Sequence, residues 1–224
     1  MKRILGIGAG GSTKVILDAL SENPKKARMV GLVDDDPAKH GKIFEGVPIL
    51  GAVRDIPKLK IKFDEALVCV GATRDTAARD KLFGQIKKMG LPIASAVSVY
   101  SRVSKSAALG TGCIVMPGVI VNAGAVIGDN VFLNTGSIVE HDCRIGRSSF
   151  LSPGCVLSGY VRIGQNTFLG SGTVVSGSLT VGSHVTAGAG SVIVRDIPDG
   201  VTCFGNPAHK NVFQRVKFDR EPLR

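Results

Sequence analysis

A histidine between two acids is the part of this sequence best suited to acid–base chemistry. Of the four histidines in the chain, only His141 has an acid on each side, Glu140 and Asp142. A carboxylate beside an imidazole fixes the tautomer of the ring and stabilises the cation that forms when the ring accepts a proton. The motif therefore predicts a general base for an attacking amine or hydroxyl. The alternative is a surface histidine with no role in catalysis.

The residues around His141 follow a repeat of six, which indicates the element that must position it. Every sixth residue from Val103 to Ile193 is Val, Ile or Leu, except Ala187. The fourth residue after each of these is mostly small, and glycine often follows the large residue directly. Each hexad predicts a short strand and a turn, with the aliphatic side chain inside and Gly, Asn or Asp supplying positive φ.

A period of six fits neither an α-helix nor a simple array of hairpins. Three hexads would close a triangular coil of 18 residues, and coils would stack at strand spacing, about 4.8 Å. Residues 103–198 make a little over five coils without an insertion. His141 lies on a turn, two residues after inward Val139, so we expect it to point out of the prism. Cys143 takes the small inward register, so we interpret it as a core residue and not as a nucleophile.

The N-terminal third predicts a phosphate-binding turn. Residues 2–7 have the composition of a buried strand, the glycines of GIGAGG occupy 6–11, and a helical pattern covers 14–20. Glycines let the backbone approach phosphates, and a helix N-terminus offers free N–H groups. A glycine turn needed only for helix–sheet packing is the alternative.

Two more segments complete a βαβ pattern. A second strand at 28–33 runs into Asp34, Asp35 and Asp36. A third strand at 66–71 precedes a helix at 74–89. This alternation predicts a small parallel sheet, in which an acid at a strand end can accept hydrogen bonds from a ribose or a base. One nucleotide fits so short a domain better than NAD.

Composition narrows the partners. The net charge is +10, but the Lys and Arg residues are scattered and not interleaved with aromatic residues, which favours an anionic small molecule over nucleic acid. The five cysteines form no CxxC pair, so we expect reduced thiols. The apolar start of the chain is too short for a signal peptide or a membrane span, which predicts a cytoplasmic protein.

The joined pattern resembles the sugar O- and N-acyltransferases, typified by sialic acid O-acetyltransferase and the bacillosamine and perosamine N-acetyltransferases. The segments that carry the resemblance are GAGGSTKV (8–15), VDDD (33–36), GVPILG (46–51), LNTGSIVEHDCRIG (133–146), LSPG (151–154) and GNPA (205–208).

The resemblance implies an α/β + β fold. A Rossmann-like sugar-nucleotide-binding domain would cover residues 1–98, a left-handed parallel β-helix 99–198, and a short C-terminal tail 199–224. The left hand comes from the resemblance, because the usual connection rule alone predicts a right-handed helix. A homotrimer with active sites between subunits is also implied, and the flat faces of a prism suit cyclic closure.

The resemblance further implies direct transfer of an acetyl group from acetyl-CoA, with His141 as base and Asp142 as the acid that orients it. The acceptor would be the amino group of a UDP- or GDP-4-amino-deoxysugar used for surface glycans. A backbone N–H near the CoA would stabilise the oxyanion. O-acetylation of a sialic-acid-like sugar and a non-catalytic sugar-nucleotide-binding scaffold are the alternatives.

Binding residues follow from the same resemblance. Gly10, Gly11 and Ser12 would meet the diphosphate, Asp34 and Asp35 the nucleoside, and Asn134 the acceptor. The expected CoA-binding residues are Phe150, Ser171, Gly188, Asn206, Pro207 and Ala208. No metal is expected, because β-helix carbonic anhydrases need three converging histidines. The prism offers only His141 and His184, more than two coils apart.

Two departures from the family pattern stand out. The family's glycine loop often reads GGHGK, whereas this chain has Ser12 and Thr13. N-acetyltransferase members often carry a further histidine nine residues after the base, where this chain has Phe150.

Overall fold

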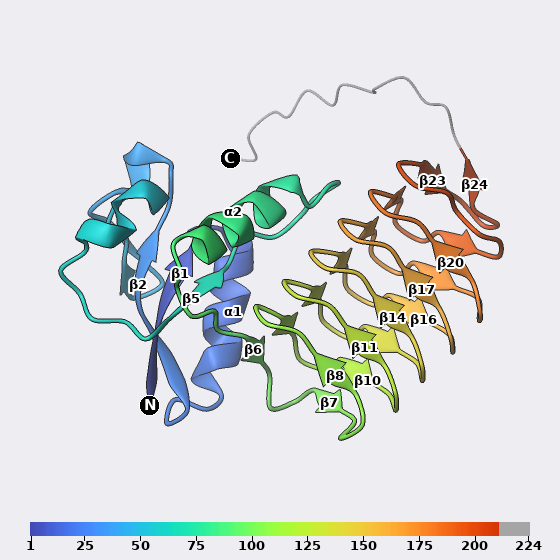
Figure 1. Cartoon of the computed structure of the whole chain (residues 1–224), viewed down its shortest axis with the longest axis horizontal. Coiled ribbons are helices and arrows are strands. Elements are labelled where there is room, and N and C mark those ends of the chain that lie inside the picture. Colours follow the sequence, from blue (N-terminus) through green and yellow to red (C-terminus); the bar gives the residue numbers. More distant parts are fainter. Residues whose placement is uncertain (211–224) are drawn as a thin grey trace.

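The computed structural model describes residues 1–210 (Figure 1). At its N-terminal end, β1 (Lys2–Ile7) lies between β2 (Ala27–Val33) and β5 (Glu65–Val68) in a parallel sheet. The sheet is covered on both faces, which is why its strands are almost wholly apolar. Helix α1 (Gly11–Ser21) packs on one face, while α2 (Ala77–Lys88) packs on the other.

Smaller elements complete this part of the chain. The 3₁₀ helices are η1 (Pro37–Lys39) and η2 (Val53–Lys58), and a hairpin joins β3 (Ile43–Phe44) to β4 (Val47–Pro48). The sequence predicted β1 with its bounds and the order of the main elements. The third strand is shorter than predicted and the second helix begins later, because residues 69–76 form a loop between them.

The rest of the described chain is a left-handed parallel β-helix of about 6 turns. Its strands form three ladders, in which each strand pairs with the strand 18 residues further along. The first ladder holds β7 (Arg102–Val103), β10 (Ile120–Val121), β13 (Ile138–Val139), β16 (Val156–Leu157), β19 (Val174–Val175) and β22 (Val192–Ile193). The second holds β8 (Ala108–Leu109), β11 (Val126–Ile127), β14 (Arg144–Ile145), β17 (Arg162–Ile163) and β20 (Thr180–Val181). The third holds β6 (Ala96–Val97), β9 (Ile114–Val115), β12 (Phe132–Leu133), β15 (Phe150–Leu151), β18 (Phe168–Leu169), β21 (Thr186–Ala187), β23 (Thr202–Phe204) and β24 (His209–Lys210).

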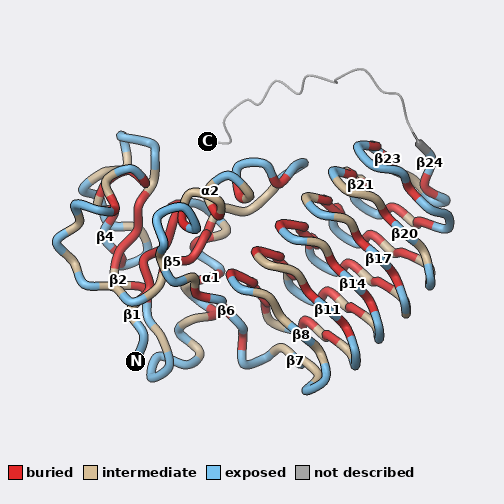
Figure 2. The backbone as a smooth tube through the Cα atoms, in the orientation of Figure 1, coloured by how far each residue is buried: buried red, intermediate tan, exposed pale blue. Residues whose placement is uncertain are grey.

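The predicted inward register is confirmed. The large aliphatic residues of the hexads are buried along the inside of the coils, as the inner red bands of Figure 2 show. The small fourth positions are buried too, with Cys143 and Ser137 at 0% exposure. The domain limits at 98 and 198 stay predictions, since strands of the third ladder lie on both sides of them. The part of the expected tail from residue 211 onward lies outside the described residues.

Each coil turns at three corners, and we number them by the ladders they join. The first corner joins the first and second ladders and carries His141 and Asp142. The second corner joins the second and third ladders and carries Ser148 and His184. The third corner joins the third ladder to the first and carries Gly136. The second residue of each turn has a positive φ, which explains the recurring Gly, Asn and Asp.

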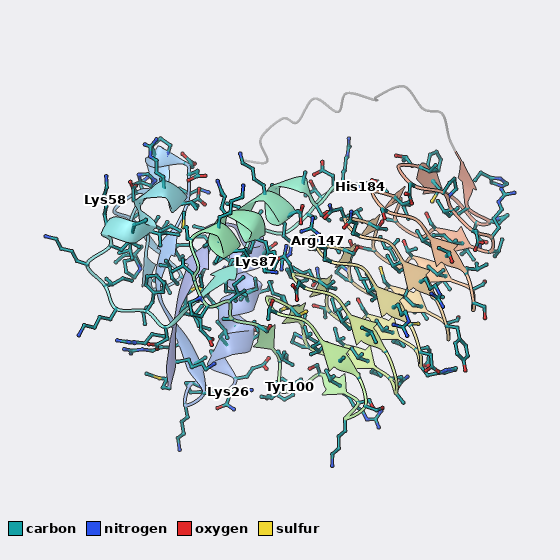
Figure 3. All side chains as sticks on the ribbon, in the orientation of Figure 1. Lys26, Lys58, Lys87, Tyr100, Arg147 and His184 are labelled. Atoms are coloured by element: carbon teal, nitrogen blue, oxygen red, sulfur yellow. The ribbon has the colours of Figure 1, made fainter. Side chains whose placement is uncertain are left out.

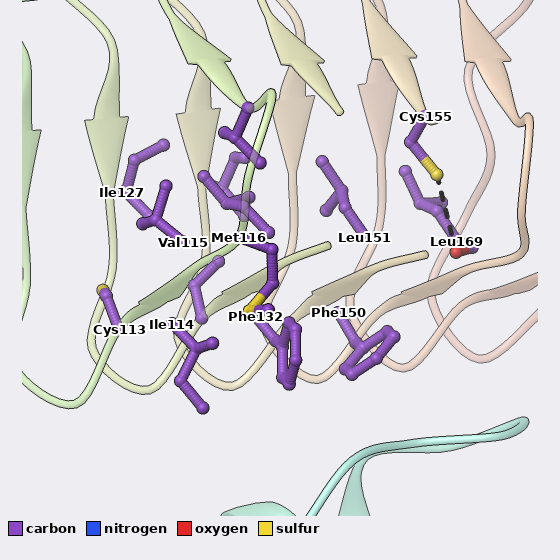
Figure 4. Close-up of a cluster of buried hydrophobic side chains, with 14 of the residues drawn as sticks. Cys113, Ile114, Val115, Met116, Ile127, Phe132, Phe150, Leu151, Cys155 and Leu169 are labelled. Atoms are coloured by element: carbon purple, nitrogen blue, oxygen red, sulfur yellow. Dashed lines mark hydrogen bonds between the residues drawn. The ribbon is translucent and has the colours of Figure 1, made fainter. Parts of the chain in front are cut away.

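The N-terminal part packs against the third ladder and the second corner. Phe132 and Phe150 project outward from the coils toward it, whereas Val115, Leu151 and Leu169 point inward (Figure 4). Around the second corner, Arg147 and Lys87 are drawn at the same junction (Figure 3). The nitrogen atoms of Arg147 and Lys87 lie 3.4 Å from Asp80 and 3.1 Å from Asp129, respectively.

Candidate active site

His141 and Asp142 form a hydrogen-bonded pair at the first corner. Nδ1 of His141 lies 3.0 Å from Oδ2 of Asp142, and the two side chains are 51% and 46% exposed. The pair is local: the turn at 141–142 follows β13, and Asp142 takes a φ of 59°, a conformation that Asp tolerates better than most residues. The carboxylate occupies Nδ1, so Nε2 is the ring nitrogen left for a substrate.

Two glycines in the neighbouring coils make room for this pair. A Cβ at Gly159, one coil further on, would lie 2.6 Å from Nε2 of His141. A Cβ at Gly124, one coil before, would lie 2.6 Å from Oδ1 of Asp142. Any larger residue at Gly159 would therefore push the ring aside. The ring's other neighbour is Tyr160, which meets it edge-on with 5.1 Å between centroids.

These neighbours were not singled out from the sequence. The signal that could have found them is the period itself, because a residue 18 positions from His141 must lie directly above it. Gly159 and Tyr160 occupy those positions. Tyr160 is 57% exposed and has a φ of 62°, which is uncommon for an aromatic residue.

Cys143 is adjacent to the pair in sequence but does not take part in it. Its side chain is buried, and its thiol donates to the carbonyl of Ser158 at 3.1 Å. Burial raises the pKa of this thiol to about 11. A thiol with so high a pKa holds almost no thiolate at neutral pH, so the interpretation as a core residue is confirmed.

The glycine loop between β1 and α1 forms a second candidate site. Gly8 has a φ of 100°, which glycine adopts readily. The loop and the 69–71 segment line a cleft of about 230 Å³, together with Asp34 and Lys39. All three residues predicted to meet a diphosphate, Gly10, Gly11 and Ser12, line this cleft.

Thr13 holds the loop in shape. It is fully buried, its hydroxyl donates to the carbonyl of Gly8 at 2.8 Å, and the N–H of Gly10 donates to it at 3.2 Å. This departure from the family's usual loop residue thus has a structural role. Ser12 is partly exposed at the start of α1, where helix N–H groups lack partners within the helix and favour an anion.

Asp34 and Asp35 diverge in their contacts. Asp34 accepts from the N–H groups of Ala9 and Asp36 and pairs with Lys39 at 3.0 Å. Burial acts to raise the pKa of Asp34, but these donors outweigh it and hold the pKa below its usual value. Asp35 accepts from the N–H of Val53 at 2.9 Å and lines a separate cleft of about 350 Å³ beside η2 and α2.

The two candidate sites lie on opposite sides of one chain. A Cβ on Gly71, at the edge of the glycine-loop cleft, would overlap Oγ of Ser12 and lie 3.9 Å from Cε2 of Phe150. Phe150 belongs to the third ladder, so the cleft borders that face of the prism. The first corner, with His141, is the corner opposite the third ladder. The structure therefore does not bring the glycine loop and His141 together within a single subunit.

The predicted acceptor and CoA residues lie along the third corner and the last coils. Asn134 precedes the turn, and its Oδ1 accepts from the N–H of Thr135 at 2.9 Å, a local turn contact. Ser171 lies on the same corner, where its carbonyl accepts from Gly190 at 2.8 Å. Gly188 packs closely against Phe204.

The remaining CoA predictions divide by exposure. Asn206 and Pro207 are exposed, whereas Ala208 is buried and donates its N–H to Val192 at 2.8 Å. Phe150 is 4% exposed, between Phe132 and Phe168. The roles of all these residues stay predictions.

The other histidines lie apart from the first corner. His184 is on the second corner, beside a cleft of about 310 Å³ that it shares with the start of α2. His40 contacts the carbonyl of Asp34 at 2.7 Å, and His209 contacts Arg195 at 3.3 Å. Within residues 1–210, no three His, Cys, Asp or Glu residues are grouped as metal ligands. Neither helix in that range is long and apolar enough to cross a membrane.

Comparisons with known proteins agree with the two-part architecture. The family model described as the PglD N-terminal domain matches residues 3–86, and the model of the bacterial transferase hexapeptide, in six repeats, matches residues 124–159. The search of curated proteins found no match.

Several solved structures are similar over almost the whole chain. The acetyltransferase domain of PglB from Neisseria gonorrhoeae, in complex with acetyl coenzyme A, is 35% identical with a TM-score of 0.84; the match covers 94% of this chain and 99% of that one. PerB from Caulobacter crescentus, in complex with CoA and GDP-perosamine, is 36% identical with a TM-score of 0.86, covering 94% and 98%. WeeI from Acinetobacter baumannii is 25% identical with a TM-score of 0.83, covering 93% and 100%. This chain is thus an acyltransferase that belongs to the hexapeptide-repeat family of sugar O- and N-acyltransferases.

Proposed function

We propose that this chain transfers the acetyl group of acetyl-CoA to the amino group of a nucleotide-linked amino sugar, a UDP- or GDP-4-amino-deoxysugar. The observation that carries the proposal is the His141–Asp142 pair, whose 3.0 Å contact leaves Nε2 facing the space kept open by Gly159. The glycine-loop cleft supports a nucleotide-linked acceptor, because it offers a helix N-terminus and Lys39 to a phosphate.

In the proposed reaction, the sugar amine attacks the thioester carbonyl while Nε2 of His141 takes a proton from the nitrogen. Asp142 stabilises the imidazolium that forms and keeps the ring in the productive tautomer. The tetrahedral intermediate then collapses, the C–S bond breaks, and the imidazolium returns a proton to the departing CoA thiolate. The products are the N-acetylated sugar nucleotide and free CoA thiol.

A partner subunit is needed if both candidate sites serve one reaction. Because the glycine loop and His141 lie on opposite sides of the chain, a sugar nucleotide held by one subunit must meet the His141 of a neighbour. Exposed apolar side chains around the first corner support an interface there: Val126 is 37% exposed and Tyr160 57%. A homotrimer with three shared sites satisfies this requirement, and cyclic symmetry closes it.

The solved relatives support both substrates. PglB was crystallised with acetyl coenzyme A and PerB with CoA and GDP-perosamine. Two structures of the Caulobacter perosamine N-acetyltransferase carry a histidine replaced by asparagine or alanine, and both hold CoA and GDP-perosamine. In that enzyme, loss of this histidine leaves binding of both compounds intact.

The test is the release of free CoA thiol from acetyl-CoA with a panel of UDP- and GDP-linked 4-amino sugars and free sialic acids. We expect turnover with one amino-sugar nucleotide. His141→Asn should lower kcat roughly 10²-fold or more, because asparagine cannot accept the proton. The matched control is His184→Asn, a change of the same kind on the second corner, which should leave kcat unchanged.

Other outcomes would replace the proposal. Release of thiol only with a sialic acid would establish O-acetylation. Tight binding of a sugar nucleotide without turnover under any condition would favour the scaffold. A His141→Asn variant with most of its activity would show that another group is the base, and light scattering that found a stable monomer would exclude the shared site.

A further inference from the structure

Two arginines stack side by side on the outside of the second ladder. Arg144 and Arg162 are paired in register in neighbouring coils, and both are exposed. Among residues 1–210, neither guanidinium forms an ion pair or a side-chain hydrogen bond. Like charges directly opposite each other on a ladder repel and destabilise the pairing. Their ladder neighbours, Val126 and Thr180, are uncharged and supply no compensation.

The pair lies beside the candidate base. Arg144 follows Asp142 by two residues, and Arg162 follows Tyr160 by two residues. At a strand rise of about 3.3 Å per residue, their Cα atoms lie roughly 7 Å from the column that holds His141. They are on the face that meets the first corner, so a ligand that reacts at His141 can extend over them. Guanidinium groups bind phosphate oxygens in a bidentate manner.

Both substrates of the proposed reaction contain a diphosphate, but only one can place it here. In a nucleotide-linked 4-amino sugar, the width of one pyranose ring separates the reacting amine from the phosphate on the anomeric carbon. In acetyl-CoA, the whole pantetheine arm separates the reacting carbonyl from the diphosphate. With the reacting atoms at Nε2 of His141, the sugar-linked phosphate reaches the second ladder, whereas the CoA phosphates lie well beyond it.

We propose that Arg144 and Arg162 bind the β-phosphate of the sugar nucleotide, the phosphate that carries the sugar. This inference rests on the proposed function. The glycine loop of one subunit supplies backbone N–H groups to the diphosphate, and the arginine pair of the neighbour supplies charge from the opposite side. The pair is then a specificity-determining element: it rewards a nucleoside diphosphate sugar over a monophosphate sugar and over a free sugar.

The experiment uses the full chain and isothermal titration with GDP, UDP, GMP, UMP and CoA. The variants are Arg144→Gln, Arg162→Gln and the double variant. Arg102→Gln is the matched control, because Arg102 is an exposed arginine at the equivalent strand position of the first ladder. We expect each single variant to weaken binding of the preferred nucleoside diphosphate about tenfold, or about 1.4 kcal/mol. Affinity for the monophosphates and for CoA should change less than about twofold, as should every affinity of the control.

Three results would overturn the inference. Unchanged diphosphate affinity in the double variant would remove the arginines from the site. A loss confined to CoA would assign them to the acyl donor. Unchanged nucleotide affinity together with subunit dissociation in light scattering would assign them to the interface.

Turnover separates this inference from the proposed function. If the wild-type chain acetylates an acceptor of the panel and the double variant has the same KM for it, only the arginine assignment fails. If the wild-type chain releases thiol with no acceptor and binds no diphosphate, both fail. Where both hold, the arginine variants raise KM for the sugar nucleotide, whereas His141→Asn lowers kcat.

Discussion

Replacing Arg79 tests how the N-terminal part is fastened to the β-helix. This side chain of α2 is fully buried. Its Nε donates to the carbonyl of Asn130 at 3.0 Å, and Nη2 donates to Gly112 at 3.3 Å. Nη1 donates to Val68 at 2.9 Å and Val70 at 3.0 Å. One guanidinium therefore joins the end of β5 to two coils of the prism.

The charge itself has no carboxylate beside it. Burial lowers the pKa of Arg79 to about 10, so the group remains protonated at neutral pH. Its carbon atom lies 5.4 Å from the centroid of Phe132, which adds a cation–π contact. The four carbonyl dipoles and the ring are what compensate the guanidinium for the water it has lost.

Arg79→Met keeps a long apolar side chain and removes all four donors. Each carbonyl left buried without a partner costs about 1–3 kcal/mol, and removing an unpaired buried cation returns part of its desolvation cost. At the lower limit of that range, four carbonyls give a loss of about 4 kcal/mol in the free energy of unfolding. Arg79→Lys, which keeps the charge but has fewer donors in a different geometry, should lose less.

The assay is urea unfolding followed by far-ultraviolet circular dichroism, at one fixed protein concentration for every variant. Lys88→Met is the control, because Lys88 is an exposed cation on the same helix. A loss below about 1 kcal/mol for Arg79→Met, similar to the control, would refute the reasoning. It would mean that water satisfies the carbonyls or that the interface rearranges around methionine.

Three further predictions concern single sites. Gly159→Ala places a Cβ 2.6 Å from Nε2 of His141, so we expect kcat to fall at least about tenfold in the thiol-release assay, with the melting temperature and nucleotide affinity unchanged. Gly84→Ala adds a Cβ that meets nothing within 4 Å inside α2, so the free energy of unfolding in urea should rise by about 0.5–1 kcal/mol, and any loss would contradict the helix assignment. The Arg3 side chain holds the pKa of Asp64 at about 2, below its ordinary 3.8, so this contact stabilises the fold above that ordinary value and is lost as pH falls toward 2. Asp64→Asn should therefore flatten the fall of the melting temperature between about pH 4 and pH 2, and an unchanged profile would exclude the contact.

The repeat was predictable because every hexad obeys the same local rule. Val139 is inward at 0% exposure, and His141, two residues later, is on the outside, as the register required. The βαβ order at the N-terminus was predictable too, since strands buried on both faces leave continuous apolar runs. Both inferences use neighbours in sequence or residues at one fixed period.

What could not be predicted depends on contacts between distant segments. Arg79 lies in a helix that the sequence did predict, but its burial depends on carbonyls of two coils that follow much later in the chain. The same holds for the separation of the glycine loop from His141, because nothing in the period states which face of the prism the N-terminal part covers. The conformation of Thr13 likewise depends on the carbonyl of Gly8, and residue type alone does not reveal that bond.

The stacking of coils has a consequence for how such a chain can change. Because each coil adds one strand spacing, about 4.8 Å, the prism works as a ruler with fixed graduations. Adding or removing 18 residues between β9 and β12 would slide the His141 level along the axis by one graduation and leave its corner the same. Any other length would rotate the histidine to a different side of the prism. The reach between the two substrates is thus adjustable only in whole steps, so that insertions elsewhere in the chain must be confined to loops that leave the count of coils intact.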